Sequence, residues 1–295
     1  MERAKIDMAE LLISFCNQLP NAHGAVAIYD TSSESCDWLR IDKNKAVSGV
    51  GLYISQNTIF CACTDGERSY LAIVDKRDYA VRDVVRLVGI MDVHSICVDG
   101  NDLIAASTGR DEVVRVAADG GGPTETLWAA TSTGADTHHV NSIVQANGTL
   151  LVSAFGPRMG SRWSSAVDGY IYDVGASKTI LRGLLQPHSL VVRNEKVVFC
   201  ESACQSIRDL DGAMRYLDGY ARGIAFDNTG NLYVGSSVGR RDATLPGMVM
   251  NPSEDGPTAG RCELIVLPEQ EGLASKAFDL AHLGAEIYDV RVLSA

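Results

Sequence analysis

Histidines gather near the starts of recurring strand-like segments of the chain. Four of the six, His94, His138, His139 and His188, lie within three residues of such a start. Because histidine changes its charge near neutral pH, it suits proton exchange with a substrate. The same placement would let histidines cap backbone groups or tie neighbouring elements together, so a functional and a structural interpretation both stand.

Two charged residues, Arg222 and Asp289, begin further segments of the same kind. A carboxylate beside an imidazole fixes its tautomer and raises its basicity, so His188 and Asp289, with His139, are predicted to be the catalytic residues. A guanidinium can hold a carboxylate or phosphate through two parallel hydrogen bonds. The residues predicted to bind such a substrate are Arg222, Asn141, His94, Arg240 and Arg158.

Arginines in these segments also have a structural interpretation. An unpaired guanidinium is costly to bury, so the predicted partner of Arg222 is either a ligand anion or Asp289. The arginines of nearby loops can pair with acids in the same way. These arginines are Arg110, Arg158, Arg162, Arg240 and Arg241, and the acids near them are Asp111, Glu112, Glu201 and Asp242.

A divalent metal is an alternative use of the histidines. Imidazoles on separate rigid strands can converge at the distance of about 2 Å that a metal requires. The predicted ligands are His94, His139 and His188, with Asp289 or water completing the shell. No short metal-ligand motif accompanies them, and the cofactor stays undetermined at this point.

The segments that carry these residues are copies of one hairpin. HSICVDGNDLIAAS from His94, NSIVQANGTLLVSA from Asn141 and HSLVVRNEKVVFCE from His188 align without a gap. RGIAFDNTGNLYVGSS aligns with one extra turn residue, and VGLYISQNTIFCAC fits less well. From Val50 to Asp289, where DVRVLSA restarts the pattern, five intervals of about 48 residues match the four-strand repeat of a propeller blade.

The repeat predicts an all-β, six-bladed β-propeller in a single domain, residues 1–295. Asp289 begins an inner strand without partners, while the N-terminus offers three strands without an inner strand: LLISFCN, GAVAIYD and CDWLRID. Joining the C-terminal strand to these three closes the ring. A β-sandwich is the alternative, and it would not explain the periodic positions. The blades are predicted at about 48–90, 91–130, 136–183, 184–218, 219–281, and 284–295 with 8–44.

One face of the propeller is expected to collect the polar residues. The first strand of each blade starts at the face where the second strand ends, so both kinds of loop meet there. His139 and Asn141, two positions apart, should point together while His138 points away. The segment from about Ser237 to Gly260 emerges at this face and is either a lid or a surface excursion.

Composition narrows the class of partner. A net charge of −11 disfavours nucleic acid and anionic membrane, and no run approaches the roughly 18 apolar residues of a membrane helix. Acids near the N-terminus argue against a signal peptide, and eight cysteines without CxxC spacing indicate reduced thiols. We therefore expect a cytoplasmic protein that binds a small anionic molecule, with its oligomeric state open.

Five segments together resemble an uncharacterised bacterial family, known as conserved hypothetical proteins or a domain of unknown function. They are HHVNS at 138–142, GLLQPHSL at 183–190, YARGIAF at 220–226, VGSSVGR at 234–240 and EIYDVRVL at 286–293. The family's His-x-Asn, Pro-His-Ser, Arg-Gly and acidic-aromatic-Asp-Val elements follow one another there over roughly the last two thirds of the chain. The resemblance implies a propeller without an established reaction. The signature positions that it supports are His139, Asn141, His188, Ser189, Arg222, Gly223, Asp289 and, less strongly, Arg240.

The chain departs from this family pattern in two places. Leu190 follows the Pro-His-Ser element where the family usually has Pro-Arg, and the blade around 200–217 is shorter. At fold level the chain is also similar to metal-dependent lactonase-type and strictosidine-synthase-type propellers. Fold by itself does not transfer function.

Two classes of function remain at this stage. The first is an enzyme, an isomerase, lyase or hydrolase, that acts on a small anionic metabolite such as a carboxylated sugar or natural-product intermediate by His/Asp acid-base chemistry in the axial funnel. The second is a non-catalytic propeller that senses a ligand or recruits a protein. The sequence has no Gly-rich phosphate loop and no HExxH.

Overall fold

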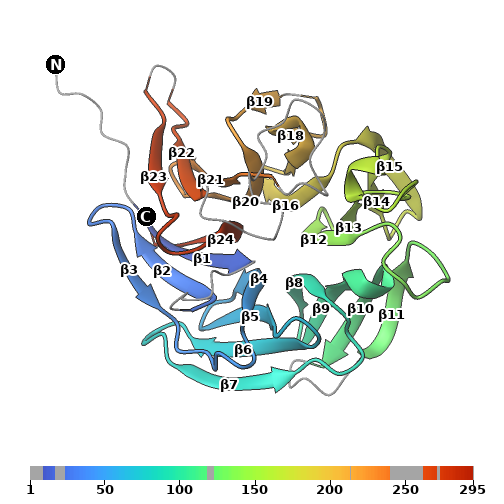
Figure 1. The fold of residues 1–295 in the computed structure, drawn as a ribbon, viewed down its shortest axis with the longest axis horizontal. Coiled ribbons are helices and arrows are strands. Elements are labelled where there is room, and N and C mark those ends of the chain that lie inside the picture. The colour runs from blue at the N-terminus through green and yellow to red at the C-terminus, as the bar shows by residue number, and fades with distance from the viewer. Residues whose placement is uncertain are drawn as a thin grey trace.

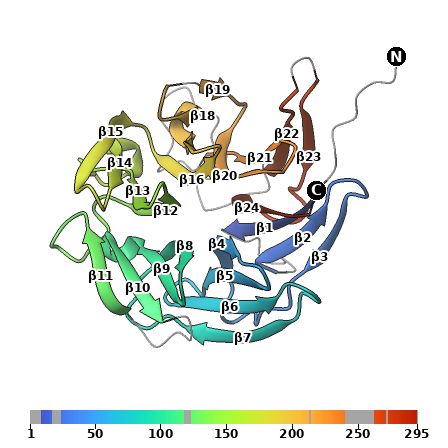
Figure 2. The ribbon, with the colours of Figure 1, turned by 180° about the vertical axis from the view of Figure 1, so that it is seen from behind.

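Six four-stranded antiparallel sheets surround a central axis in the computed structural model of the chain (Figure 1). The structure describes residues 9–16, 24–117, 123–212, 214–239, 262–270 and 273–294. The innermost strands, β4, β8, β12, β16, β20 and β24, face the axis in both ribbon views (Figures 1 and 2). The predicted six-bladed β-propeller is confirmed, and the sandwich alternative is wrong.

Each blade runs from an inner strand at the axis to an outer strand at the rim. The first blade contains β4 (Ser48–Ile54), β5 (Thr58–Thr64), β6 (Ser69–Asp75) and β7 (Val81–Arg86). The second contains β8 (Val93–Asp99), β9 (Asp102–Ser107), β10 (Glu112–Ala117) and β11 (Pro123–Ala129). The third contains β12 (Val140–Ala146), β13 (Thr149–Ala154), β14 (Gly169–Asp173) and β15 (Lys178–Leu184).

The remaining blades follow the same order, except that the last one joins both ends of the chain. The fourth contains β16 (Pro187–Arg193), β17 (Lys196–Glu201), β18 (Ser206–Asp209) and β19 (Met214–Tyr216). The fifth contains β20 (Tyr220–Phe226), β21 (Leu232–Ser237), β22 (Cys262–Leu267) and β23 (Lys276–Asp279). The sixth contains β24 (Glu286–Ser294), β1 (Glu10–Cys16), β2 (Val26–Asp30) and β3 (Ser35–Trp38).

The ring closes where β24 pairs with β1. The two strands are antiparallel, with Leu12 opposite Arg291, Ile13 opposite Val290 and Cys16 opposite Glu286. Figure 1 accordingly shows the C-terminus beside β1. The predicted closure by one C-terminal and three N-terminal strands is confirmed.

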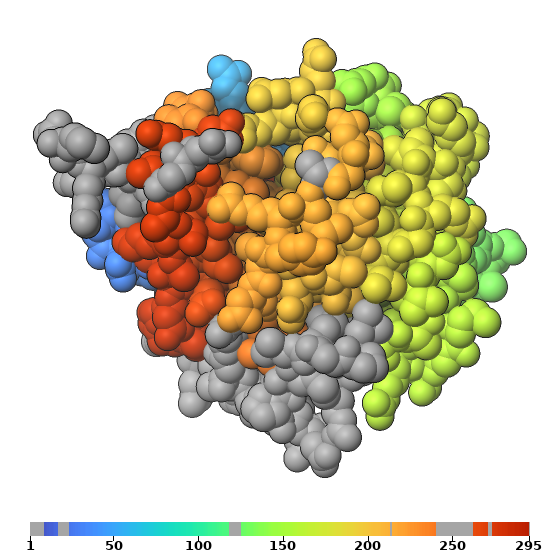
Figure 3. Space-filling view, turned by 90° about the horizontal axis from the view of Figure 1, so that it is seen from above, coloured from blue at the N-terminus to red at the C-terminus, as the bar shows by residue number. Residues whose placement is uncertain are grey.

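Apolar side chains fill the spaces between successive blades. Between the sixth and first blades, for example, Leu12 and Val26 pack with Leu52 and Ile59. Seen edge-on, the segments coloured red, orange and yellow follow one another around the rim (Figure 3). Among the described residues the helical elements are the 3₁₀ turns η1 (Thr108–Arg110), η2 (Trp163–Ser165) and η3 (Ser202–Cys204), and none forms a helix long and apolar enough to cross a membrane.

Side chains of the repeated motif also bind neighbouring inner strands together. The serine that follows His94, Asn141 or His188 accepts a hydrogen bond from a backbone N–H of the next blade, and Asp289 does the same at the closure. These bonds run from Ile143 N to Ser95 Oγ (3.2 Å), Leu190 N to Ser142 Oγ (2.8 Å), Gly223 N to Ser189 Oγ (2.8 Å) and Leu52 N to Asp289 Oδ2 (2.9 Å).

Gly223 shows why the Arg-Gly element needs its glycine. Its φ is +65°, in the left-handed region, and a Cβ there would lie 2.8 Å from the Cα of Asp289. Only glycine combines this conformation with so close an approach of two strands at low cost. The element therefore sets how near β20 comes to β24.

Candidate functional site

A cavity of about 340 Å³ opens at the face where the inner strands start, and we call it the mouth pocket. Residues just before the inner strands reach it from left-handed backbone: Asp92 precedes β8 at φ +51°, and His139 precedes β12 at φ +56°. Such a conformation is uncommon for residues other than glycine and persists where the surroundings enforce it. The lining residues are Cys16, Ser48, Val50, Thr64, Gly66, Asp92, His94, Asp136, His139, Phe155, Trp163, Arg222 and Tyr288.

Two histidine–aspartate pairs meet in this pocket. His94 Nε2 lies 3.2 Å from Asp92 Oδ2, and His139 Nδ1 lies 3.3 Å from Asp136 Oδ2. The two imidazole rings are nearly perpendicular, with their centroids 4.9 Å apart. Because a carboxylate accepts but does not donate, each pairing places a hydrogen on the named ring nitrogen and orients the ring.

Aromatic rings enclose His139. Phe155 lies 4.4 Å and Trp163 4.6 Å from its ring, measured between centroids. Burial in this surrounding lowers the pKa of His139, while Asp136 acts in the opposite direction. A neutral imidazole with Nδ1–H directed at Asp136 has its lone pair on Nε2. His139 can therefore accept a proton through Nε2.

Asp111 holds the segment that carries this pair. Its fully buried carboxylate accepts hydrogen bonds from the backbone N–H of Thr137 (2.6 Å) and of His138 (2.7 Å), and from that of Val140 (3.3 Å). The Thr137 hydroxyl donates a further bond at 2.8 Å. Asp111 was predicted as a possible partner for an arginine, but in the structure it accepts hydrogen bonds from three backbone N–H groups. His138 turns away toward the hydroxyl of Tyr170, at 3.0 Å.

Arg222 lies in the wall of the mouth pocket with Glu286 as its acidic partner. The guanidinium is 3.2 Å from Glu286 Oε2 and 3.7 Å from Cys16 Sγ, and it lies near the rings of Tyr220 and Tyr288. The alternative that Asp289 is the internal partner of Arg222 is therefore wrong. β24 presents Glu286 at this point, three residues before Asp289.

Below the mouth pocket lies a much smaller space of about 10 Å³, which we call the axial cavity. His188, Asn141 and Asp289 line it, together with His94, Ser95, Ser142, Ser189, Tyr288 and Arg291. Asn141 donates to His139 O (3.2 Å) and accepts from the Ser153 hydroxyl (2.8 Å), so it supports the backbone of His139 from below.

The predicted catalytic pair of His188 and Asp289 is not joined by a hydrogen bond. His188 Nδ1 contacts Gln186 O (3.1 Å) and Ser202 Oγ (2.8 Å), and its Nε2 has no hydrogen-bond partner among the described residues. Asp289 accepts from Arg291 at 2.7 Å and from the Leu52 amide. Burial lowers the pKa of His188 strongly and raises that of Asp289. Asp289 joins the sixth blade to the first through the Leu52 amide, whereas His188 contacts residues of its own blade, of which Ser202 donates to Ala221 O of the fifth.

The three histidines predicted as metal ligands do not gather as a ligand set. The ring of Phe155 lies 4.4 Å from that of His139 and 4.9 Å from that of His188. Within the described ranges, no group of three or more His, Cys, Asp or Glu side chains is placed to hold a metal ion.

The loop arginines have different surroundings. Arg158 lies 4.5 Å above the Trp163 ring, and Arg110 Nη1 is 3.8 Å from Glu112. Glu201 pairs with Arg208 at 2.6 Å. Arg240, Arg241 and Asp242, with most of the predicted lid at 237–260, lie outside the described residues.

Sequence reasoning missed several residues of the mouth pocket. Asp136, Phe155, Trp163 and Tyr288 belong to it, and Glu286 pairs with its arginine. The acidic-aromatic-Asp-Val element did contain Glu286 and Tyr288, but its role was given to Asp289. Asp136 lies outside the repeated hairpin segments, so aligning these segments does not identify it as a site residue.

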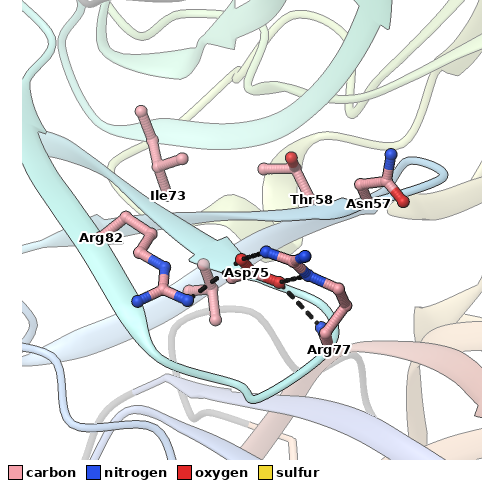
Figure 4. A pocket seen from close by; sticks show the side chains of 7 residues that line it. Asn57, Thr58, Ile73, Asp75, Arg77 and Arg82 are labelled. Atoms are coloured by element: carbon pink, nitrogen blue, oxygen red, sulfur yellow. Dashed lines mark hydrogen bonds and ion pairs between the residues drawn. The ribbon is translucent and has the colours of Figure 1, made fainter.

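Other hollows are weaker candidates because their charges are already paired. A pocket of about 310 Å³ on the first blade contains Arg77 and Arg82, and Figure 4 shows both guanidinium groups turned toward Asp75. The distances to Asp75 are 2.7 and 3.1 Å. Arg82 also lies 2.6 Å from Asp78, so two carboxylates compensate the two guanidinium groups and leave little net charge to attract an anion.

Comparison with known proteins matches the chain to a family of unknown function. The model of a family described as "Domain of unknown function (DUF4915)" matches residues 67–295. A search of curated proteins found no match. Similarity to solved structures, by contrast, extends over nearly the whole chain.

Three solved structures illustrate that similarity. A chain from a nidogen/laminin complex has a TM-score of 0.66 and 10% identity over 97% of this chain and 98% of its own. A protein of unknown function from Bacteroides caccae has 0.63 and 10% over 97% and 99%. A luciferin-regenerating enzyme has 0.54 and 16% over 84% and 92%. At these identities the likeness shows the fold alone.

Proposed function

The chain belongs to the family described as a domain of unknown function (DUF4915), and we propose that it is an enzyme that transfers protons on a small metabolite in the mouth pocket. The observation that carries the proposal is the pair of His–Asp couples, His94–Asp92 and His139–Asp136, whose rings lie 4.9 Å apart in one cavity. An imidazole oriented by a carboxylate can act first as a base and then as an acid on one substrate.

His139 is the residue that we assign to proton abstraction. Its Nδ1 is held by Asp136, burial keeps it neutral, and Nε2 is the nitrogen left for a substrate. His94, held by Asp92, lies across from it. The reaction classes that fit are isomerisation, elimination and hydrolysis, because each requires a proton to be removed and another to be delivered.

A carboxylated sugar is the substrate class that we propose. Asp92 and Asp136, with side chains 50% and 30% exposed, can accept hydrogen bonds from hydroxyl groups. Trp163 and Phe155 offer apolar faces, and the guanidinium of Arg222 has five N–H donors, so a ligand carboxylate can share it with Glu286. A pocket of this volume accommodates a small metabolite.

A propeller that binds such a ligand without chemistry is the second candidate. It is favoured by His188 and Asp289, which are occupied by internal hydrogen bonds as a scaffold requires. The two candidates differ in whether His139 exchanges protons with the bound molecule.

Hydrogen exchange at carbon separates the candidates. Glucuronate and galacturonate, with glucose and galactose as uncharged matches, are incubated with the protein in D₂O and followed by NMR, and binding is measured by calorimetry. We expect binding of the acids only, with deuterium incorporated beside their carbonyl or carboxylate group. Glucuronolactone opening tests the hydrolytic variant.

Two histidine variants provide the internal comparison. His139→Gln should lower the exchange rate by about 10²-fold or more, the usual contribution of a general base. His138→Gln, one residue away and turned toward Tyr170, should keep it. Binding of the acids without exchange or ring opening would favour the non-catalytic propeller. An equal loss of the exchange rate in both variants would show that His139 is not the base.

A further inference from the structure

The axial cavity below the mouth pocket has the size of one water molecule. Its volume of about 10 Å³ is close to the smallest space, about 10–15 Å³, that holds a single water. A site that small holds water only if two to four polar partners surround it. The lining supplies them.

Three buried polar atoms of this lining have no hydrogen-bond partner in the part of the chain that the structure describes. They are His94 Nδ1, His188 Nε2 and the hydroxyl of Tyr288. A buried polar atom left without a partner costs about 1–3 kcal/mol. Three such atoms around one cavity indicate a common ligand.

The hydrogen positions on the histidines follow from their other contacts. His188 Nδ1 lies 3.1 Å from the carbonyl of Gln186, which can only accept, so Nδ1 carries the hydrogen. Its second neighbour, Ser202 Oγ, gives its own hydrogen to Ala221 O at 2.6 Å. His94 Nε2 faces a carboxylate and carries the hydrogen for the same reason. His188 Nε2 and His94 Nδ1 are therefore both acceptors.

We propose that the axial cavity binds one water molecule, which donates a hydrogen bond to His94 Nδ1 and another to His188 Nε2 and accepts one from the Tyr288 hydroxyl. Two acceptors and one donor match the two hydrogens and a lone pair of water. A metal cation fits poorly, because the carboxylate of the lining, Asp289, is already bound to Arg291 and to the Leu52 amide.

This water joins the mouth pocket to the interior. A continuous hydrogen-bonded chain then runs from Asp92 through His94, the water and His188 to Ser202 and the Ala221 carbonyl. It holds His94 in the tautomer that keeps Nε2–H directed at Asp92. The site is independent of the proposed function, because the same atoms need partners whether or not the pocket is catalytic.

A crystal structure at atomic resolution and ¹⁵N NMR of the histidine rings test the site in the full chain. We expect one peak of water density within about 2.6–3.2 Å of the three atoms, with the Nδ1–H tautomer for His188 and the Nε2–H tautomer for His94. A collapsed or empty cavity, density with anomalous scattering, or a protonated His188 Nε2 would overturn the proposal.

Removal of the Tyr288 hydroxyl provides a second test of the water site. Tyr288→Phe keeps the ring and deletes the donor, so the water should become less well ordered while both tautomers persist. Tyr170→Phe removes a hydroxyl that contacts His138 outside the cavity, and it should leave the water as ordered as in the unaltered protein. Equal water order in the two variants would show that Tyr288 is not a ligand and contradict the proposal.

Discussion

The guanidinium of Arg222 lies 3.2 Å from the carboxylate of Glu286, and the two side chains are only 7% and 6% exposed. Arg222 comes from β20 and Glu286 from β24, the strand that closes the ring. Tyr220 and Tyr288 place their rings near the same guanidinium. One buried ion pair thus links the fifth and sixth blades at the wall of the mouth pocket.

Breaking this pair should destabilise the protein strongly. Glu286→Gln removes the carboxylate charge that lies 3.2 Å from a buried guanidinium, and we expect the free energy of unfolding in urea to fall by about 3–5 kcal/mol. Arg182→Met, which removes an exposed pair with Asp168, is the control and should cost less than about 1 kcal/mol. A similar small loss for both variants would mean that Glu286 does not compensate Arg222.

The stability of the protein should fall as the pH drops below the ordinary pKa of an imidazole. Burial lowers the pKa of His188 well below 6.5, so below pH 6.5 the unfolded chain binds a proton that the native His188 does not. The free energy of unfolding then decreases with falling pH, by up to about 1.4 kcal/mol per pH unit for this group. His139 acts in the same direction.

Replacing His188 isolates that contribution. His188→Gln cannot titrate, so urea unfolding between neutral and mildly acidic pH should depend less on pH, by up to one proton. The exposed His282 supplies the matched variant, and His282→Gln should keep the original slope. An unchanged slope in His188→Gln would contradict the buried, neutral state of His188.

The serine bonds between blades should contribute individually to stability. Ser142→Ala and Ser189→Ala each leave a backbone N–H of the next inner strand without its acceptor, and we expect losses of about 1–3 kcal/mol in urea unfolding. Ser33→Ala, at an exposed turn, should change little. If the inner serines behave like Ser33, packing alone holds the blades in register.

Much of the fold follows from the repeat, whereas the partners in the site do not. Blade number and closure depend on strand periodicity, which the aligned segments display directly. The serines of the same segments were visible too, but nothing in one sequence says that their hydroxyls reach the next blade. Such contacts depend on how closely the inner strands approach, as at Gly223 and Asp289.

Glu286, and not Asp289, pairs with Arg222, and the alternation of side chains along a strand was not enough to predict this. The register between β1 and β24 shifts between Ser14 and Phe15, so Ser14 lies opposite Asp289 and Phe15 opposite Ile287. A β-bulge of this kind changes which side chains share a face. Asp136 was missed for another reason, because it lies in a loop whose path is fixed by Asp111 from the preceding blade.

Asp111 should act as a positioning residue for the His139–Asp136 pair. Asp111→Asn replaces one accepting oxygen by an amide that cannot accept from Thr137 or His138, while asparagine still tolerates the left-handed φ of +55°. We expect about 1–3 kcal/mol lower stability and faster amide hydrogen exchange at 136–140. Asp168→Asn, at an exposed site of the third blade, should leave that exchange unchanged. Slow exchange in both variants would show that Asp111 does not fix this segment.

The closing strand itself offers the most direct test of the ring. Deleting residues 286–295 removes β24, exposes the edge of β1 and takes away Glu286, Tyr288 and Asp289 together. Cooperative urea unfolding should be largely lost. Deleting only 293–295 spares the pairing from Glu286 to Val292, so this shorter form should unfold cooperatively.

Supplying the strand separately distinguishes closure from a general effect of truncation. A synthetic peptide of residues 286–295 should bind the shortened chain, because β1 offers a free edge and β20 offers the guanidinium that Glu286 contacts in the full chain, and cooperativity should return as the peptide is added. The same peptide with Glu286→Gln should bind more weakly, since it restores the strand without the countercharge. If the shortened chain unfolds as cooperatively as the full one without peptide, five blades and an open edge are sufficient, and the pairing of β24 with β1 is not what holds the propeller together.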